Sequence, residues 1–143
     1  MITEDCISFE TAKLLKKKGF DCNANCYYIE NSVTKTLFYS PIRENHNASC
    51  IENDAHINVS SGKMSAPTLQ MAMKWLREVH NIHPNIVVDV FDTVALYRVE
   101  GIFQSGSGRH WFDFEPNDNS GGLYNTYEKV CEAAIKYCLE NLI

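Results

Sequence analysis

The sequence predicts an α+β domain, and three features of its residue pattern carry that prediction. Residues 65–80 and 125–142 repeat apolar side chains at helical spacing, and a shorter helical pattern begins at Ser8. Runs of β-branched and aromatic residues, separated by turn residues, lie between these segments. Together they predict an antiparallel sheet of about five strands with three helices packed mainly on one face, in the order α-β-β-α-β-β-β-α.

The size and charge of the chain narrow the classes of protein to which it can belong. Its 143 residues, 45% of them hydrophobic, suit a single domain over residues 1–143 with a substantial core. A net charge of −5 argues against direct nucleic-acid binding, because neutralising phosphates requires a basic surface. No apolar run approaches the roughly 18 residues of a membrane span. The start MITEDC has acids where a signal peptide is basic. We therefore expect a cytoplasmic protein without a membrane partner.

The N-terminal half is predicted to contain one helix, one hairpin and a long loop. Ser8 can cap the helix, and Gly19 offers the left-handed residue that ends it. Two β-prone runs around a short polar turn predict a hairpin from about Cys26 to Tyr39. The segment from Pro41 to Lys63 is polar and has little periodicity apart from a candidate short strand at 56–59. We expect this segment to be the longest and most mobile loop.

The second predicted helix leads directly into a strand. Ser65 is expected to cap this helix, with Pro67 in its first turn and Asn81 at the left-handed position after its end. The run IVVDVF, residues 86–91, is apolar on both faces except at Asp89, which predicts an interior strand.

The C-terminal part is predicted to complete a three-stranded antiparallel meander and to end in a helix. The next strand covers residues 94–104, with Gly101 marking a bulge. A turn at 105–108 then leads into a strand at 109–115. Asn125 or Thr126 can cap the last helix, whose apolar and charged residues occupy opposite sides.

Three segments of the chain together resemble a family of short proteins carried by gut anaerobes and by their phages and mobile elements. The segments are ISFETAKLLKKKGF, SAPTLQMAMKWLREVHNIH and YEKVCEAAIKYCLENLI. They cover the three predicted helices, roughly a third of the chain. No activity is assigned to that family, so the resemblance implies a shared α+β domain and a mobile-element origin but no site residues.

A zinc site is the first candidate chemistry. Cys22, Cys26, His46 and Cys50 form C-x₃-C and H-x₃-C pairs, which fall within loose limits of zinc-ligand spacing. Whether the four residues converge on a metal stays open in the sequence. We favour buried or incidental thiols, kept reduced in the cytoplasm, and expect neither a metal nor a cofactor.

Four weaker patterns have ordinary structural explanations. Residues 117–128 resemble a calcium-binding loop, but the first ligand position lacks its aspartate. The run SGSGR at 105–109 could hold an anion, yet a hairpin turn explains its glycines. His80 and His83 lie three residues apart, but the predicted helix ends between them. Cys131 and Cys138 are too far apart on one helix for a disulfide and are expected in the core.

The last candidate site is the group His110, Trp111, Asp113 and Glu115 on the third strand of the meander. By strand alternation His110 shares a face with two phenylalanines, whereas Trp111, Asp113 and Glu115 share the other. An exposed tryptophan beside carboxylates is typical of a binding surface. The alternative is that Trp111 packs under the long loop.

These observations favour a non-enzymatic cytoplasmic protein that acts through a protein partner, with a second copy of itself as one candidate. The chain offers no nucleophile motif, no convincing metal set and no phosphate loop. One alternative is a small enzyme or ligand-binding domain with a pocket between the 41–63 loop and the 94–115 meander, using His110 and nearby carboxylates. A second alternative is an acidic binder of nucleic-acid-processing proteins, which a single-sign acidic face would support.

Overall fold

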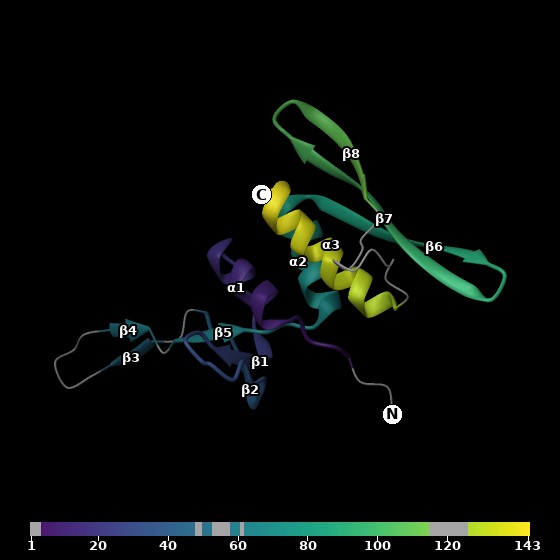
Figure 1. The fold of residues 1–143 in the computed structure, drawn as a ribbon. Coiled ribbons are helices and arrows are strands. Elements are labelled where there is room, and N and C mark those ends of the chain that lie inside the picture. The colour runs from purple at the N-terminus through teal and green to yellow at the C-terminus, as the bar shows by residue number, and fades with distance from the viewer. Residues whose placement is uncertain (1–3, 48–49, 53–57, 61, 115–125) are drawn as a thin grey trace. The chain divides into compact units, whose positions relative to one another are not determined.

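The computed structural model describes residues 4–47, 50–52, 58–60, 62–114 and 126–143 (Figure 1). The chain divides into two compact units, Met1–Thr68 and Leu69–Ile143, and each contains helix and antiparallel strands, which confirms the α+β class. The prediction of one five-stranded sheet is wrong. The described strands form two three-stranded sheets, one in each unit, and a two-stranded ladder. Five described strands, rather than two, lie between the first and second helices. A single domain over residues 1–143 stays a prediction.

The first unit combines one helix with two small sheets. Strands β2, β1 and β5 pair in that order, and β3 pairs with β4. Ser8 Oγ accepts a hydrogen bond from Thr11 N, and Gly19 has a φ of 87°, so both predicted ends of the helix are confirmed. The elements are α1 (Phe9–Lys17), β1 (Ala24–Ile29), β2 (Phe38–Glu44), β3 (Cys50–Glu52), β4 (Asn58–Ser60) and β5 (Lys63–Ser65).

The segment 41–63 is not the loop that its composition predicts. Strand β2 continues through Pro41 to Glu44, and the segment also contains β3, β4 and the start of β5. Pro41 is tolerated because β2 is an edge strand whose register with β1 shifts between Ala24 and Cys26. Nearly all of β2 is exposed on both faces, so it lacks the alternation that reveals a half-buried strand.

The predicted cap at Ser65 is also wrong, because α2 (Leu69–His80) begins four residues later. Ser65 ends β5 and is buried, and its Oγ accepts a hydrogen bond from His46 N at 3.0 Å. Pro67 lies before the helix, and its carbonyl accepts a hydrogen bond from Ile7 N at 3.0 Å. A serine that suits a helix cap is therefore used in the polar core of the first unit.

The second unit contains the predicted meander and two helices. Asn81 takes the expected left-handed φ of 54° after α2, and Thr126 caps α3, accepting from Lys129 N at 3.4 Å. Among the residues that the structure describes, no helix is long and apolar enough to cross a bilayer. The remaining elements are β6 (Ile82–Phe91), β7 (Val94–Ser105), β8 (Gly108–Phe114) and α3 (Tyr127–Asn141).

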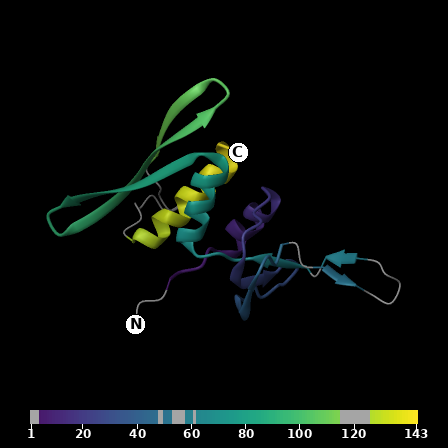
Figure 2. The same ribbon diagram turned by 180° about the vertical axis from the view of Figure 1, so that it is seen from behind.

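Both helices of the second unit cover the same face of the meander. Strands β6, β7 and β8 pair in that order, and Figures 1 and 2 both show α2 and α3 on one side of β6 and β7. The ring of Tyr137 in α3 stacks on Phe112 and Phe114, with centroids 5.9 and 4.4 Å away. Val99 and Phe112 are buried beneath the helices. We call this covered face the inner face and the opposite one the outer face.

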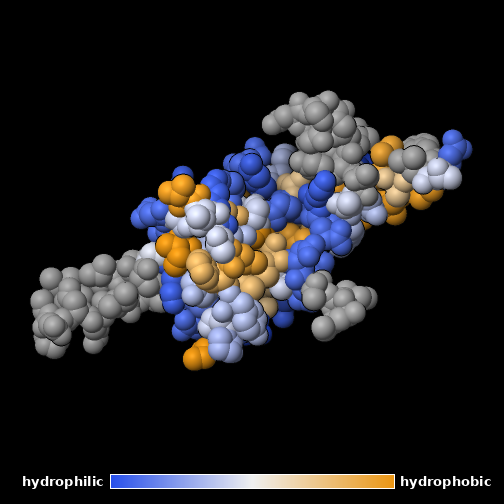
Figure 3. Space-filling view, turned by 60° about the horizontal axis from the view of Figure 1, so that its bottom comes forward, coloured by the Kyte–Doolittle hydropathy of each residue, from blue (hydrophilic) through white to orange (hydrophobic). Residues whose placement is uncertain are grey.

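Among the described strands β6 lies at an edge of its sheet, so the prediction of an interior strand at 86–91 is wrong. Its apolar residues are not all covered, because Val88 is 49% and Val90 67% exposed. Figure 3 shows hydrophobic residues along this end of the β6–β7 hairpin, at the right of the view. Pro84 fits an edge strand, where a missing N–H need not break the ladder.

Gly101 does not mark a bulge. The register of β7 continues unbroken, with Gly101 opposite Pro84 on β6 and Phe112 on β8. A Cβ at this position would lie 2.5 Å from Phe112 Cζ and 2.6 Å from the carbonyl oxygen of His83. Glycine is therefore required by close packing on the inner face rather than by a change of register.

Candidate functional site

Strand β8 places the predicted site residues on different faces of the meander. His110 lies on the inner face with Phe112, whereas Trp111 and Asp113 lie on the outer face, so the predicted alternation is confirmed. Glu115 lies outside the described residues. Because His110 and Asp113 point to opposite faces, the structure does not bring them together as an acid–base pair.

His110 contributes to the turn between β7 and β8. Its Nε2 lies 2.8 Å from Ser107 Oγ, and its ring stacks on Phe103 with centroids 5.2 Å apart. Ser107 Oγ is also 2.9 Å from Ser105 Oγ, and Gly108 has a φ of 118°. These contacts support the interpretation of residues 105–108 as a hairpin turn rather than an anion site.

Trp111 is the largest exposed side chain on the outer face. It is 75% exposed, in contrast to Trp75 of α2, which is 2% exposed. Its cross-strand neighbour is Ile102 of β7, which in turn pairs with His83 of β6. This exposure does not favour packing of Trp111 under another segment. Trp111 and Ile102 instead form an apolar pair on the outer face, between the charged residues Arg109 and Asp113 of β8.

The charges of the outer face are partly neutralised within the sheet. Arg98 of β7 donates from Nε to Asp89 Oδ2 at 3.1 Å and from Nη1 to Glu100 Oε2 at 2.9 Å. The hydrogen bonds from Arg98 to Glu100 and Asp89 raise the pKa of its guanidinium. The charged groups of Arg98, Asp89 and Glu100 therefore form one network within the outer face.

Two other charged side chains of the outer face lie outside this network. Asp113 stands opposite Glu100, and Arg109 stands opposite Gln104. Within the described part of the chain neither Asp113 nor Arg109 forms an ion pair. Like charges directly across a strand pair are unfavourable, and although Glu100 is paired with Arg98, Asp113 forms no ion pair with a described cation.

The outward edge of β8 presents the backbone of the same residues. A two-residue turn links Ser105 to Gly108, and the pair that flanks such a turn is hydrogen-bonded. Hydrogen-bonded and non-hydrogen-bonded pairs alternate along an antiparallel ladder. The N–H and C=O groups of Arg109, Trp111 and Asp113 therefore point away from β7. No described strand pairs with this edge, so it combines open backbone groups with the exposed indole of Trp111 and the charges of Arg109 and Asp113.

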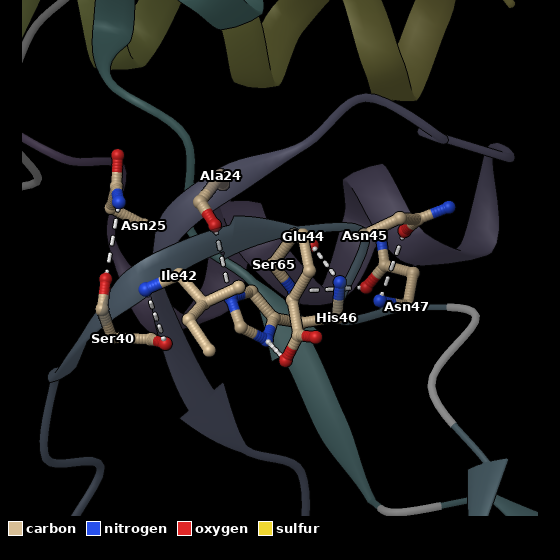
Figure 4. Close-up of polar contacts among 9 residues, drawn as sticks. All are labelled: Ala24, Asn25, Ser40, Ile42, Glu44, Asn45, His46, Asn47 and Ser65. Carbon is tan, nitrogen blue, oxygen red and sulfur yellow. Dashed lines mark hydrogen bonds and ion pairs between the residues drawn. The ribbon is translucent and has the colours of Figure 1, made fainter.

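A second polar cluster surrounds His46 in the first unit (Figure 4). The His46 side chain is completely buried and lies against Tyr27, with ring centroids 4.7 Å apart. Its Nε2 lies 3.0 Å from Ala24 O, and because a carbonyl oxygen only accepts, Nε2 carries the proton. Its Nδ1 lies 3.3 Å from Glu44 Oε1. Burial lowers the pKa of His46, although the Ala24 hydrogen bond and Glu44 oppose that shift.

Asn47 extends this cluster to the backbone of neighbouring elements. Its Oδ1 accepts a hydrogen bond from Ser65 N at 2.9 Å, and its Nδ2 donates to Phe20 O at 2.9 Å. Asn47 N in turn donates to Asn45 Oδ1 at 3.1 Å. These contacts tie β5 to the chain that follows β2 and α1, which is a structural function.

The four residues considered as zinc ligands have different surroundings. His46 uses one ring nitrogen for Ala24, and the thiol of Cys26 lies beside that of Cys6. Burial, together with this contact, raises the pKa of Cys6 to about 12. The side chain of Cys50 lies outside what the structure describes. In the described part no three His, Cys, Asp or Glu side chains gather as metal ligands, and whether the four residues converge on a metal stays open.

The remaining weak patterns have structural explanations. The ring of His80 packs edge-on against the ring of Trp75, with centroids 4.4 Å apart. His83 Nε2 instead lies 2.8 Å from Asn81 Oδ1. Cys131 and Cys138 are buried in the core of the second unit, as predicted. Most of the calcium-like loop at 117–128 lies outside the described residues.

Comparison with known proteins does not assign the chain to a family. No protein-family model, curated protein or solved structure matches it. The resemblance to short proteins of gut anaerobes and their mobile elements therefore stays a prediction.

Sequence reasoning missed Arg109 as part of the candidate surface. The signal was present in the run Arg109-His110-Trp111-Phe112-Asp113, where opposite charges lie two residues on either side of a tryptophan. At strand spacing these three residues share one face and one edge. The strand edge itself could not be recognised until the pairing order was known.

Proposed function

We propose that the protein is a non-enzymatic cytoplasmic protein that acts through a protein partner docking on the outer face and open edge of β8. The observation that carries the proposal is the exposure of Trp111, 75%, on a regular strand. Tryptophan and arginine are the residues most enriched at the energetic centres of interfaces. A mobile-element origin, which the resemblance implies, belongs with this proposal.

The surroundings of Trp111 support a protein partner rather than a small ligand. Ile102 lies beside it, and Arg109, Asp113 and His83 surround this apolar pair. An apolar anchor within a polar rim is the usual anatomy of a protein interface. The open backbone groups of β8 add hydrogen-bonding capacity that suits a strand of a partner.

The two alternatives have less support from the described residues. An enzyme using His110 with nearby carboxylates needs these groups on one face, whereas His110 bonds Ser107 on the inner face and Asp113 is on the outer one. An acidic binder of nucleic-acid enzymes needs a single-sign face. The outer face instead mixes Arg98 and Arg109 with its carboxylates.

Capture of partners by full-length variants tests the proposal. The wild-type chain and Trp111→Ala are immobilised and exposed to a lysate of the native host, and bound proteins are quantified by mass spectrometry. We expect Trp111→Ala to capture at least tenfold less of the specific partner, because an anchor of this kind contributes on the order of 2 kcal/mol or more to binding.

Two matched variants define the surface. Tyr39→Ala removes another exposed aromatic strand residue, 71% exposed, from the first unit and should leave capture unchanged. Val90→Ala removes an exposed apolar residue from the end of the β6–β7 hairpin. Loss of partner with Val90→Ala but not with Trp111→Ala would place the docking surface at that hairpin and contradict the proposal.

A further inference from the structure

We propose that the partner of this surface is a second copy of the chain, and that the β8 strands of two copies pair antiparallel about a two-fold axis at Trp111. The inference rests on the proposed function, since it names the occupant of the same surface. Three features of β8 support it: the direction of its open backbone groups, the positions of its charges and the alternation of its faces. Each of these is complementary to the same feature of an identical strand that runs antiparallel to it.

The backbone of β8 is suited to pairing with an identical strand. Arg109, Trp111 and Asp113 direct their N–H and C=O groups to the open edge, as the two-residue turn dictates. A two-fold axis at Trp111 places Trp111 opposite Trp111 of the second copy and Arg109 opposite Asp113. All three positions then form hydrogen-bonded pairs, so no outward backbone group along this stretch remains unpaired.

The charges on the outer face complement each other in this register. Each Asp113 faces Arg109 of the other copy across the strand pair, and the two-fold axis produces this pair twice. Asp113 thereby gains the cation that it lacks beside Glu100. Opposite charges directly across an antiparallel pair stabilise it, and the two indoles meet at the centre.

The inner face continues in the same register. In this pairing His110 lies opposite Phe112 of the second copy. Within each copy the ring of Phe103 already lies beside the rings of His110 and Phe112, with centroid distances of 5.2 and 6.1 Å. Aromatic pairs across strands add stability to a sheet. The inner aromatic row therefore extends across the axis.

Other positions of the two-fold axis along β8 fit less well, so the charges of the strand select one register. An axis at Arg109 or at Asp113 places like charges opposite each other. An axis at His110 or at Phe112 leaves Asp113 opposite Ser107 or Trp111, without a cation. The axis at Trp111 matches every charge in the strand with its opposite.

Charge exchange tests the register in the full chain. Sedimentation velocity from ~2 to ~200 µM should show a reversible monomer–dimer equilibrium, as expected for an interface smaller than the standard size. Arg109→Glu and Asp113→Arg each create two like-charge pairs and should weaken the dimer by roughly tenfold to a hundredfold. The double variant Arg109→Glu with Asp113→Arg restores opposite pairs and should recover wild-type association to within about threefold.

A matched control separates this effect from net charge. Lys13→Glu makes the same charge reversal on the exposed side of α1 and should leave the dimer unchanged. Far-ultraviolet circular dichroism of every variant checks that it folds. A dimer that forms but ignores both single variants, or that the double variant fails to restore, overturns pairing at β8.

Amide hydrogen exchange gives an independent test of the edge. The N–H groups of Arg109, Trp111 and Asp113 should exchange fast in dilute protein and slow down as the dimer forms. The N–H groups of His110 and Phe112 should be protected at both concentrations, because they point to β7. Unchanged exchange at Trp111 in a sample shown to be dimeric overturns the proposal.

Failure of this inference can be distinguished from failure of the proposed function. A wild-type chain that stays monomeric at ~200 µM overturns self-association. If Trp111→Ala still abolishes capture of another protein, the docking surface stands with a different occupant. If Trp111→Ala changes neither association nor capture, both proposals are wrong.

Discussion

The His46 cluster and the outer face of β8 are both rich in polar groups, but they use them differently. His46 is fully buried, and its backbone N–H and its Nε2–H donate hydrogen bonds to Ser65 Oγ and Ala24 O within the same unit. On β8, Trp111 is exposed, and Asp113 forms no ion pair in the described part of the chain. Polar groups satisfied inside a unit stabilise it, whereas exposed groups with unmatched charge are available to another molecule.

Replacement of His46 should produce a large loss of stability. His46→Ala removes a buried ring and leaves Ala24 O without its hydrogen bond, which should cost about 2–4 kcal/mol of unfolding free energy. Urea unfolding followed by circular dichroism measures the change. His83→Ala, at an exposed histidine, should lie within about 0.5 kcal/mol of wild type. Equal losses in the two variants would remove the distinction between buried and exposed polar groups.

Acid should weaken the His46 cluster selectively. Burial lowers the pKa of His46 in the folded chain below its ordinary value of 6.5, so the unfolded chain binds more protons in that range. The stability that neutral His46 contributes is therefore lost progressively as pH falls below about 6.5. Unfolding free energies measured between pH 5 and pH 8 should fall more steeply for wild type than for His46→Gln. Parallel profiles would contradict this assignment.

Truncation of Trp111 should have the smallest effect on folding. Its indole is mostly exposed, so Trp111→Ala should change the unfolding free energy by about 0.5 kcal/mol or less. The adjacent Phe112, which is buried beneath Tyr137, provides the contrast, because Phe112→Ala should cost about 3–5 kcal/mol. Fluorescence of the buried Trp75 follows unfolding of this unit in both variants. A large loss with Trp111→Ala would assign Trp111 to the core instead of the surface.

Local signals in the sequence predicted the elements whose ends depend on adjacent residues. Ser8, Gly19, Asn81 and Thr126 act at helix ends through their own side chains or backbone angles, and all four predictions are confirmed. The alternation of β8 and the three-stranded meander are likewise confirmed, because strand period and turn residues are local features.

Predictions that depended on contacts between residues far apart in the sequence were wrong. Ser65 suits a helix cap, yet its hydroxyl accepts a hydrogen bond from the backbone N–H of His46, nineteen residues earlier in the chain. The apolar run at 86–91 suits an interior strand, yet it forms a sheet edge whose Val90 is exposed. Gly101 could not be distinguished from a bulge without the position of Phe112. For the candidate site, alternation placed Trp111 correctly, but the edge that it borders depends on strand order.

Pro84 has a consequence for how many copies can assemble. It stands opposite Gly101, whose backbone groups face β8, so the nitrogen of Pro84 points away from β7 toward the open side of β6. In a two-fold pair joined through β8, each end of the combined six-stranded sheet would be a β6 strand. A further strand would meet a proline at either end, which cannot donate a hydrogen bond. Assembly should therefore close at two copies and resist growth into fibres.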